Sequence, residues 1–249
     1  MERWARSVAF VTGASAGIGK SIVEKLVEAD IKVVGLARRK EKLDEIATNL
    51  SSKKGKFYPY VGDVSKEEDL LSAFKWTKQH VGPVSLLINN AGVAPITSAT
   101  EFSTKDWASA LNINVLATAI ATREALKQMK ENNIDGHIIN INSVAGHRVS
   151  ENLPGGHVYQ ASKHALKAIT ESLRFELIRN RSKVRVTGIH PGTVKTDMYY
   201  ISKEKFNNAN HKGLNIPTLE SDDVVQAILY ALSVPQRVQI NELTIQALF

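Results

Sequence analysis

The sequence predicts an α/β domain in which a doubly wound, seven-stranded parallel sheet carries helices on both faces. Short apolar runs alternate with segments whose apolar residues recur at helical spacing, and this alternation is typical of a doubly wound sheet. The runs are short and apolar, as expected of parallel strands that are buried on both faces. The seven candidate strands are residues 8–11, 32–36, 56–61, 84–88, 137–141, 184–189 and 238–245.

The segments between these runs predict the helices in order. A glycine-rich turn opens the first helix, and a second helix is expected to end near Leu50. The third passes through residues 70–74, and the fourth, after the run at 84–88, reaches Met129. A long helix with one apolar stripe follows the fifth run, whereas residues 197–217 break the alternation.

Composition narrows the class of protein. The 249 residues are 43% hydrophobic and 23% charged, which are ordinary globular values that exclude a disordered or coiled-coil chain. No window approaches 18 apolar residues, and the start lacks a signal peptide's apolar run, so we expect a cytoplasmic protein with no membrane span. Cysteine is absent, which excludes disulfides and thiolate chemistry. Since no linker or repeat is visible, residues 1–249 are expected to form one domain.

The net charge of +7 comes from 32 Lys and Arg against 25 Asp and Glu. A clustered basic surface would favour nucleic-acid binding. Here the cations are scattered in short groups, such as residues 53–54, 179–185 and 203–205. We therefore expect no nucleic-acid partner.

The glycine-rich turn at residues 12–19 lies between the first strand and the first helix. Gly13, Gly17 and Gly19 permit a sharp turn and close backbone approach, and the positive end of the helix attracts a pyrophosphate. The spacing G-x-x-x-G-x-G differs from the common dinucleotide pattern G-x-G-x-x-G. Its position between strand and helix nevertheless favours nucleotide binding over an ordinary turn.

The end of the second strand favours NADP(H) over NAD(H). An acidic residue there would bind the ribose 2′-hydroxyl of NAD, whereas arginine suits the 2′-phosphate of NADP. The position is occupied by Ala37, which is followed by Arg38, Arg39 and Lys40. The alternative is a solvated basic helix start, although cations are unfavourable at that end of a helix dipole.

Tyr159 and Lys163 lie four residues apart, so on a helix they share one face. A nearby ammonium should lower the pKa of the phenol and equip Tyr159 to exchange a proton with an alcohol or carbonyl oxygen. Tyr199 and Lys203 form a second pair with the same spacing. We favour the first pair because it follows a strand that ends at Ser143, whose hydroxyl should project from the carboxyl edge of the sheet.

Taken together, these motifs resemble the short-chain dehydrogenase/reductase family over essentially the whole chain. The resemblance rests on the glycine-rich turn, Asn89-Asn90-Ala91-Gly92, Ser143, Tyr159-x-x-x-Lys163 and Pro191-Gly192. It implies a single Rossmann-like domain, a homodimer or homotetramer, and hydride transfer between a nicotinamide and an alcohol or carbonyl. It also implies that Ser143 orients the substrate oxygen, that Tyr159 is the general acid/base, and that Lys163 tunes the tyrosine and binds the nicotinamide ribose.

The same resemblance implies roles for further residues. Asn114 corresponds to the asparagine that holds a proton-relay water, Asp63 and Val64 to a pair beside the adenine, and Thr196 to a threonine near the carboxamide. Residues expected to contact the cofactor are Gly13, Ser15, Gly17, Ile18, Gly19, Arg38, Arg39, Asp63, Val64, Asn90, Ala91, Gly92, Tyr159, Lys163, Pro191, Gly192, Val194 and Thr196.

These lesser sites have structural alternatives. The asparagines at 89, 90 and 112 could cap or bridge the backbone, and Pro191-Gly192 could be an ordinary turn. Asp63 could be the N-cap of a helix that begins at Ser65.

Residues 1–4, 34–39 and 140–149 resemble a subgroup that contains insect farnesol dehydrogenases and vertebrate ketosteroid reductases. The expected activity is therefore that of an NADP-dependent alcohol dehydrogenase or carbonyl reductase for an apolar substrate such as farnesol. A ketosteroid or general carbonyl reductase is the alternative within the family. A nucleotide-binding redox sensor is the alternative without turnover.

The segment at about residues 197–216 is either a set of surface helices or a lid over an apolar ligand, since it carries several large apolar side chains among polar ones. The histidines show no H-E-x-x-H or similar spacing, so no metal is expected. The expected substrate pocket consists of Val144, His147, His157, Met198 and Tyr199.

Overall fold

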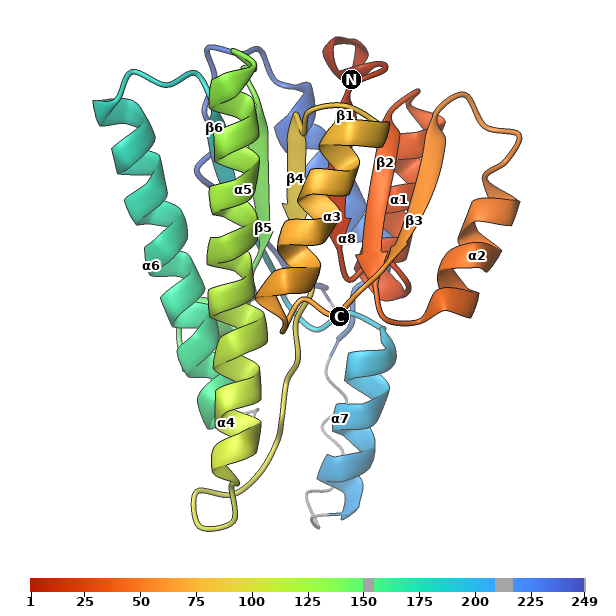
Figure 1. Ribbon diagram of the computed structural model, residues 1–249. Helices are drawn as coiled ribbons and strands as arrows, with labels where there is room; N and C mark the ends of the chain where they lie inside the picture. Colours follow the sequence, from red (N-terminus) through yellow and green to blue (C-terminus); the bar gives the residue numbers. More distant parts are fainter. Residues whose placement is uncertain (150–154, 209–216, 249) are drawn as a thin grey trace.

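The computed structural model describes residues 1–149, 155–208 and 217–248. A seven-stranded sheet runs through the molecule in the order β3-β2-β1-β4-β5-β6-β7, and every neighbouring pair is parallel (Figure 1). The predicted doubly wound α/β fold is thus confirmed. The strands are β1 (Val8–Thr12), β2 (Lys32–Ala37), β3 (Lys56–Val61), β4 (Leu86–Asn89), β5 (His137–Ile141), β6 (Arg185–Pro191) and β7 (Glu242–Ile245).

The helices form two layers, one on each face of the sheet. The α-helices are α1 (Gly17–Glu28), α2 (Lys40–Asn49), α3 (Glu67–His80), α4 (Thr104–Leu111), α5 (Ala117–Glu131), α6 (His157–Arg179), α7 (Asp197–Asn208) and α8 (Ser221–Ser233). Buried side chains of α1, α2 and α8 form one apolar cluster against the sheet, and those of α3, α5 and α6 form the other. Strands such as β1 are buried along their whole length because both faces are covered.

The fourth helix differs from the prediction. Residues 90–97 run irregularly from the end of β4, and a separate α4 is joined to α5 through a π-helical turn, η2 (Asn112–Leu116). The turn brings Asn114 into the interior, where it is 1% exposed. The sequence did not predict this interruption, because the turn is stabilised by bonds from Asn114 to the distant residues Val93 and Ser162.

The last strand is shorter than predicted, beginning at Glu242 rather than at residue 238. Gln239 approaches β6 through its side-chain amide, which donates to the carbonyl of Val186 at 2.7 Å. Val238 turns back to bond the carbonyl of Pro235. Side-chain bonds therefore replace the ladder over these residues.

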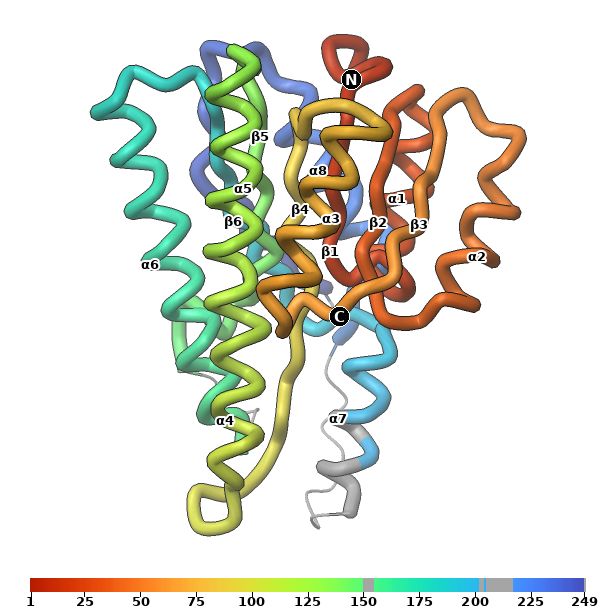
Figure 2. Tube along the Cα trace, viewed as in Figure 1, coloured from red at the N-terminus to blue at the C-terminus, as the bar shows by residue number. Residues whose placement is uncertain are grey.

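The carboxyl ends of the strands meet at one edge of the sheet, and α4 and α7 both extend beyond that edge (Figures 1 and 2). Ligands of open α/β sheets bind at this edge. Within the described residues, none of the helices combines the length and apolarity needed to cross a membrane.

Candidate active site

The glycine-rich turn forms a tight cradle at the start of α1. Gly13 and Gly17 have φ values of +67° and +51°, a region that favours glycine. A Cβ on Gly19 would lie 2.2 Å from the carbonyl oxygen of Gly13, so any side chain there would force the turn open. Ala16 precedes α1 and has no polar side chain with which to cap it, so the first N–H groups of α1 suit an anionic ligand.

Asn90, at the end of β4, ties this turn to the next strand. Its amide donates to the carbonyls of Thr12 and Gly13 at 3.0 and 3.2 Å. The backbone N–H groups of Asn90 and Ala91 both donate to the Thr12 hydroxyl at 3.0 Å. Asn90 therefore bridges backbone, as one alternative anticipated, and it thereby holds the cradle in shape. A contact between Asn90 and a cofactor stays a prediction.

Two arginines lie at the rim of the cradle. The Arg39 guanidinium donates from Nε to the Ser15 hydroxyl at 3.2 Å and from Nη1 to Asp197 at 3.1 Å. Arg38 is close enough for its charge to help lower the pKa of Asp63. Lys40 instead pairs with Asp44 one turn along α2. The sequence showed no signal for the Arg39–Asp197 pair, whose members are 158 residues apart.

Asp63 shapes the loop after β3. Its carboxylate accepts the N–H of Ser65 at 2.9 Å, while α3 begins later, at Glu67. The anticipated N-cap is thus a local turn before the helix, not the cap of α3 itself. Burial would raise the pKa of Asp63, but hydrogen bonds from Ser65 and the charges of Arg38 and Lys66 bring it below its ordinary value.

Ser143, Tyr159 and Lys163 come together at the carboxyl end of β5. The Ser143 hydroxyl hydrogen-bonds to the Tyr159 side chain and accepts the N–H of Ala145 at 3.1 Å. Lys163 donates from Nζ to the carbonyl of Ile141 at 2.9 Å and lies 5.7 Å from the centroid of the Tyr159 ring. The three side chains come from β5's end and the first turns of α6, as the sequence predicted.

The acid–base properties of this group differ from the sequence expectation. Burial raises the pKa of Tyr159, and the hydrogen bond to Ser143 offsets this only in part. Burial also lowers the pKa of Lys163 to about 8. The expected lowering of the phenol pKa is therefore wrong for the protein alone, because desolvation raises this pKa by more than the Ser143 hydrogen bond lowers it. Tyr159 is protonated at neutral pH, which suits a proton donor.

Asn114 connects the π-helical turn to this group. Its amide donates to the carbonyl of Val93 and to the Ser162 hydroxyl, both at 2.9 Å, and accepts the Val93 N–H at 2.8 Å. Ser162 in turn donates to the carbonyl of Tyr159 at 2.7 Å. Both N–H groups of the amide already donate hydrogen bonds. A relay water at Asn114 would therefore have to donate to an oxygen atom of Asn114. That role stays a prediction.

The segment after β6 returns to the glycine cradle. The methyl carbon of Thr196 lies 2.9 Å from where a Cβ on Gly17 would stand, so the two residues are in close contact. Val194 pairs with Leu219 in an isolated bridge, and the Gly192 N–H donates to the carbonyl of Ile245. These contacts bring the Pro191-Gly192 turn and Thr196 to the same edge as the cradle.

The expected substrate-pocket residues fall into three places. Met198 and Tyr199 lie on α7, where the neighbouring side chains of Tyr200 and Ile201 are 59% and 58% exposed. His147 instead packs against the β6–β7 edge, with its Nε2 at 3.4 Å from the Thr244 hydroxyl. Residues 209–216 of the expected lid, and the side chain of Lys203 in the second Tyr–Lys pair, lie outside the described residues.

The remaining two expected pocket residues flank the group of Ser143, Tyr159 and Lys163. Val144 begins the short helix η3 (Val144–Gly146) directly after Ser143. His157 is the exposed first residue of α6, two positions before Tyr159. Both are near the predicted acid/base, so their place in a substrate pocket stays a prediction.

Comparison with known proteins agrees with this geometry. Residues 7–206 match the family model for short chain dehydrogenases, and the chain belongs to this family of oxidoreductases. It is 42% identical over 248 residues to farnesol dehydrogenase of Aedes aegypti, covering 99% of this chain and 98% of the relative. It is also 42% identical over 247 residues to human dehydrogenase/reductase SDR family member 11, with 98% and 95% covered. The family resemblance is thus confirmed.

Solved structures that superimpose on this chain have the same fold. An actinorhodin polyketide ketoreductase with NADPH superimposes with a TM-score of 0.86 at 25% identity, covering 97% of this chain and 96% of that one. A closed form of serine dehydrogenase complexed with NADP⁺ gives a TM-score of 0.81 at 29% identity, with 96% and 94% covered.

Proposed function

We propose that this protein is an NADP(H)-dependent alcohol dehydrogenase or carbonyl reductase whose substrates are apolar, such as farnesol and farnesal. The observation that carries the proposal is the group formed by partly buried Tyr159 with buried Ser143 and Lys163, at the sheet edge that also holds the glycine cradle. A nucleotide-binding redox sensor needs the cradle but has no use for a proton donor beside it. The enzyme is therefore favoured over the sensor.

The residues present fit a dinucleotide phosphate. The cradle leaves no room for a Cβ at Gly19, and the first N–H groups of α1 suit a pyrophosphate. Arg38 and Arg39 supply cations at the rim, which support NADP(H) over NAD(H). When bound there, the nicotinamide would accept a hydride from an alcohol or give one to a carbonyl carbon.

The protein's own groups would handle the oxygen and its proton. The Ser143 hydroxyl orients the substrate oxygen by a hydrogen bond, and Tyr159 Oη gives a proton to it in the reductive direction. The resulting phenolate is stabilised by the Lys163 ammonium, which is held in place by its bond to the carbonyl of Ile141.

The exposed apolar side chains of α7 and the activity named for one relative support the proposal of an apolar substrate. Met198, Tyr200 and Ile201 expose apolar surface on a helix that extends beyond the sheet edge (Figure 1). Covering such surface contributes about 25 cal/mol per Å² removed from water, which favours a long isoprenoid over a short alcohol. The farnesol dehydrogenase of Aedes aegypti, at 42% identity, supports the same choice. A ketosteroid or general carbonyl reductase is the second candidate, since those substrates are apolar too.

A homodimer or homotetramer is also proposed. Leu116, Phe175 and Ile178 are large apolar residues that are more than half exposed, at 53%, 54% and 60%. Exposed apolar residues of this kind are covered in many oligomers. Light scattering of the purified protein would give the number of chains. A cytoplasmic location stays a prediction.

A substrate panel tests the proposed function. The purified protein would be assayed with NADP⁺ and NAD⁺ on a series of primary allylic alcohols that ends in farnesol. We expect kcat/KM to rise with chain length and to be higher with NADP⁺. Equal turnover of short polar alcohols would overturn the apolar substrate, and an absence of turnover with both cofactors across alcohols and carbonyls would overturn the enzyme.

A further inference from the structure

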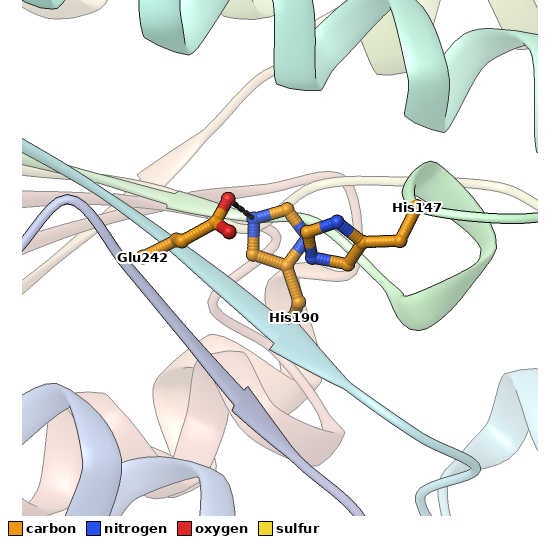
Figure 3. A group of neighbouring side chains, drawn as sticks. All are labelled: His147, His190 and Glu242. Atoms are coloured by element: carbon orange, nitrogen blue, oxygen red, sulfur yellow. Dashed lines mark ion pairs between the residues drawn. The ribbon is translucent and has the colours of Figure 1, made fainter.

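Three side chains of the kinds that bind transition metals gather beside the catalytic serine. His147 follows η3, His190 lies on β6 and Glu242 begins β7 (Figure 3). Their candidate ligand atoms all lie within 4.8 Å of one another. The residues are far apart in the sequence, which is why a search for histidine spacing did not find them.

The sheet register builds this cluster. Gly188 on β6 pairs with Glu242 on β7, and His190 stands two residues later on the same face of β6. The His190 ring folds back over Gly188, so a Cβ at position 188 would lie 2.7 Å from Nε2. Glycine at 188 therefore lets Nε2 approach the Glu242 carboxylate, with 3.6 Å between Nε2 and Oε2.

The second ring nitrogen of His190 determines the tautomer. Nδ1 lies 3.3 Å from the Ser143 carbonyl oxygen, an acceptor, so Nδ1 carries the proton and Nε2 presents a lone pair. A lone pair then faces a carboxylate across 3.6 Å, close to the separation of about 3.3 Å between two ligands at tetrahedral zinc.

We propose that His147, His190 and Glu242 bind one divalent transition-metal cation, with Zn²⁺ the ion best suited to two imidazoles and a carboxylate. The His147 ring lies 4.1 Å from that of His190, centroid to centroid, and is exposed, so it can turn to supply the third nitrogen. A histidine that ligates through one nitrogen commonly donates its other N–H to a carbonyl, as His190 does to Ser143. Water would complete four ligands.

The site is distinct from the proposed hydride chemistry and does not depend on it. Lys167 on α6 is the unfavourable neighbour, because its positive charge acts on His190. An ion here would tie β6 and β7 to the segment that follows Ser143.

Calorimetric titration of the chelator-treated full-length protein with ZnCl₂ tests the proposal. We expect one Zn²⁺ per chain. Removing a hydrogen-bond partner of a metal ligand typically weakens metal binding by about 10–100-fold. His147→Ala and Glu242→Gln, both at exposed positions, remove ligands themselves, so each should weaken Zn²⁺ binding by at least that factor. Lys167→Gln should strengthen binding. His80→Ala, an exposed histidine of α3, is the matched control and should change nothing.

Two further measurements distinguish a specific three-ligand site from nonspecific Zn²⁺ binding. Gly188→Ala should displace the His190 ring and weaken Zn²⁺ binding while leaving both exposed ligands in place. Co²⁺ in place of Zn²⁺ should show the visible absorption of a four-coordinate ion in the wild type and lose it in His147→Ala. The proposal is overturned if binding is not saturable, or if the His147 and Glu242 variants bind like His80→Ala.

Discussion

The sheet edge has a part around β1 and β2, called here the cofactor half after its proposed role, and a part around β5 and β6, called the catalytic half. The two halves are built differently. Around β1 and β2 the cradle is made of backbone: glycines at positive φ, bare N–H groups at the start of α1, and Asn90 bonded to carbonyl oxygens. Around β5 and β6 the proposed chemistry depends on side chains, namely partly buried Tyr159 with buried Ser143 and Lys163. Backbone N–H groups do not titrate, whereas the side chains of a buried site have pKa values set by their neighbours.

The largest expected effect falls in the catalytic half. Tyr159→Phe removes the proton donor and should lower kcat by about 10²–10⁴-fold, while NADPH affinity, measured by fluorescence titration, stays nearly unchanged. Tyr199→Phe is the matched control from the second Tyr–Lys pair. Comparable losses in two folded variants would show that the wrong pair was chosen.

Ser143→Ala should reduce kcat by about 10²–10³-fold, because the substrate oxygen loses a donor as its charge develops. The change also removes the cap of η3, so thermal unfolding should show a small loss of stability. Ser103→Ala removes the equivalent cap of α4, and it should lose stability without losing activity. If the two variants lose the same fraction of activity, Ser143 acts only as a cap.

The cofactor half should respond selectively to Arg39→Gln. Each charge-assisted bond to the 2′-phosphate contributes about 1.5–3 kcal/mol, so NADPH affinity should fall by about 10–100-fold and NADH affinity hardly at all. Arg38→Gln should act in the same direction. Lys40→Gln is the control, because Lys40 pairs with Asp44 rather than facing the cradle. An equal loss of affinity for NADPH and NADH would mean that the basic cluster is only a solvated helix start.

The pH dependence of the rate tests the catalytic half without a substitution. Burial lowers the pKa of Lys163 to about 8, so its ammonium is present below that pH and is lost above it. We expect kcat/KM for carbonyl reduction to fall by up to about tenfold per pH unit above about 8, since the developing phenolate loses its cation. The unfolded chain holds this proton up to 10.5, so unfolding free energy should rise with pH between the two values. A flat rate profile to pH 10 would contradict the role of Lys163.

The smallest expected effect is on how kcat/KM depends on the length of the substrate. Met198→Ser and Ile201→Ser remove apolar surface from α7 and should lower kcat/KM for farnesol by a few-fold, a loss of about 1 kcal/mol, without affecting short alcohols. Leu71→Ser on α3 is the control, since Leu71 is 38% exposed against 36% for Met198. A uniform loss across all chain lengths would mean that α7 supports the fold and not the substrate.

The two halves also differed in how far sequence reasoning reached. The cradle, the basic pair after β2 and the Tyr159–Lys163 spacing are local patterns, and the structure brings them to one edge as predicted. The π-helical turn at Asn114, the Arg39–Asp197 pair and the short β7 were missed, because each depends on contacts between distant segments.

Sequence alone determined the strand–helix alternation, the glycine turn and the choice of Ser143, Tyr159 and Lys163 as candidates, since these follow from period, steric freedom and spacing along the chain. Tertiary structure decided the pKa values, because burial is a property of the assembled site: it raised the pKa of Tyr159 where spacing alone predicted a lowering. It also decided that His147, His190 and Glu242 meet, through a sheet register that no local pattern in the chain expresses.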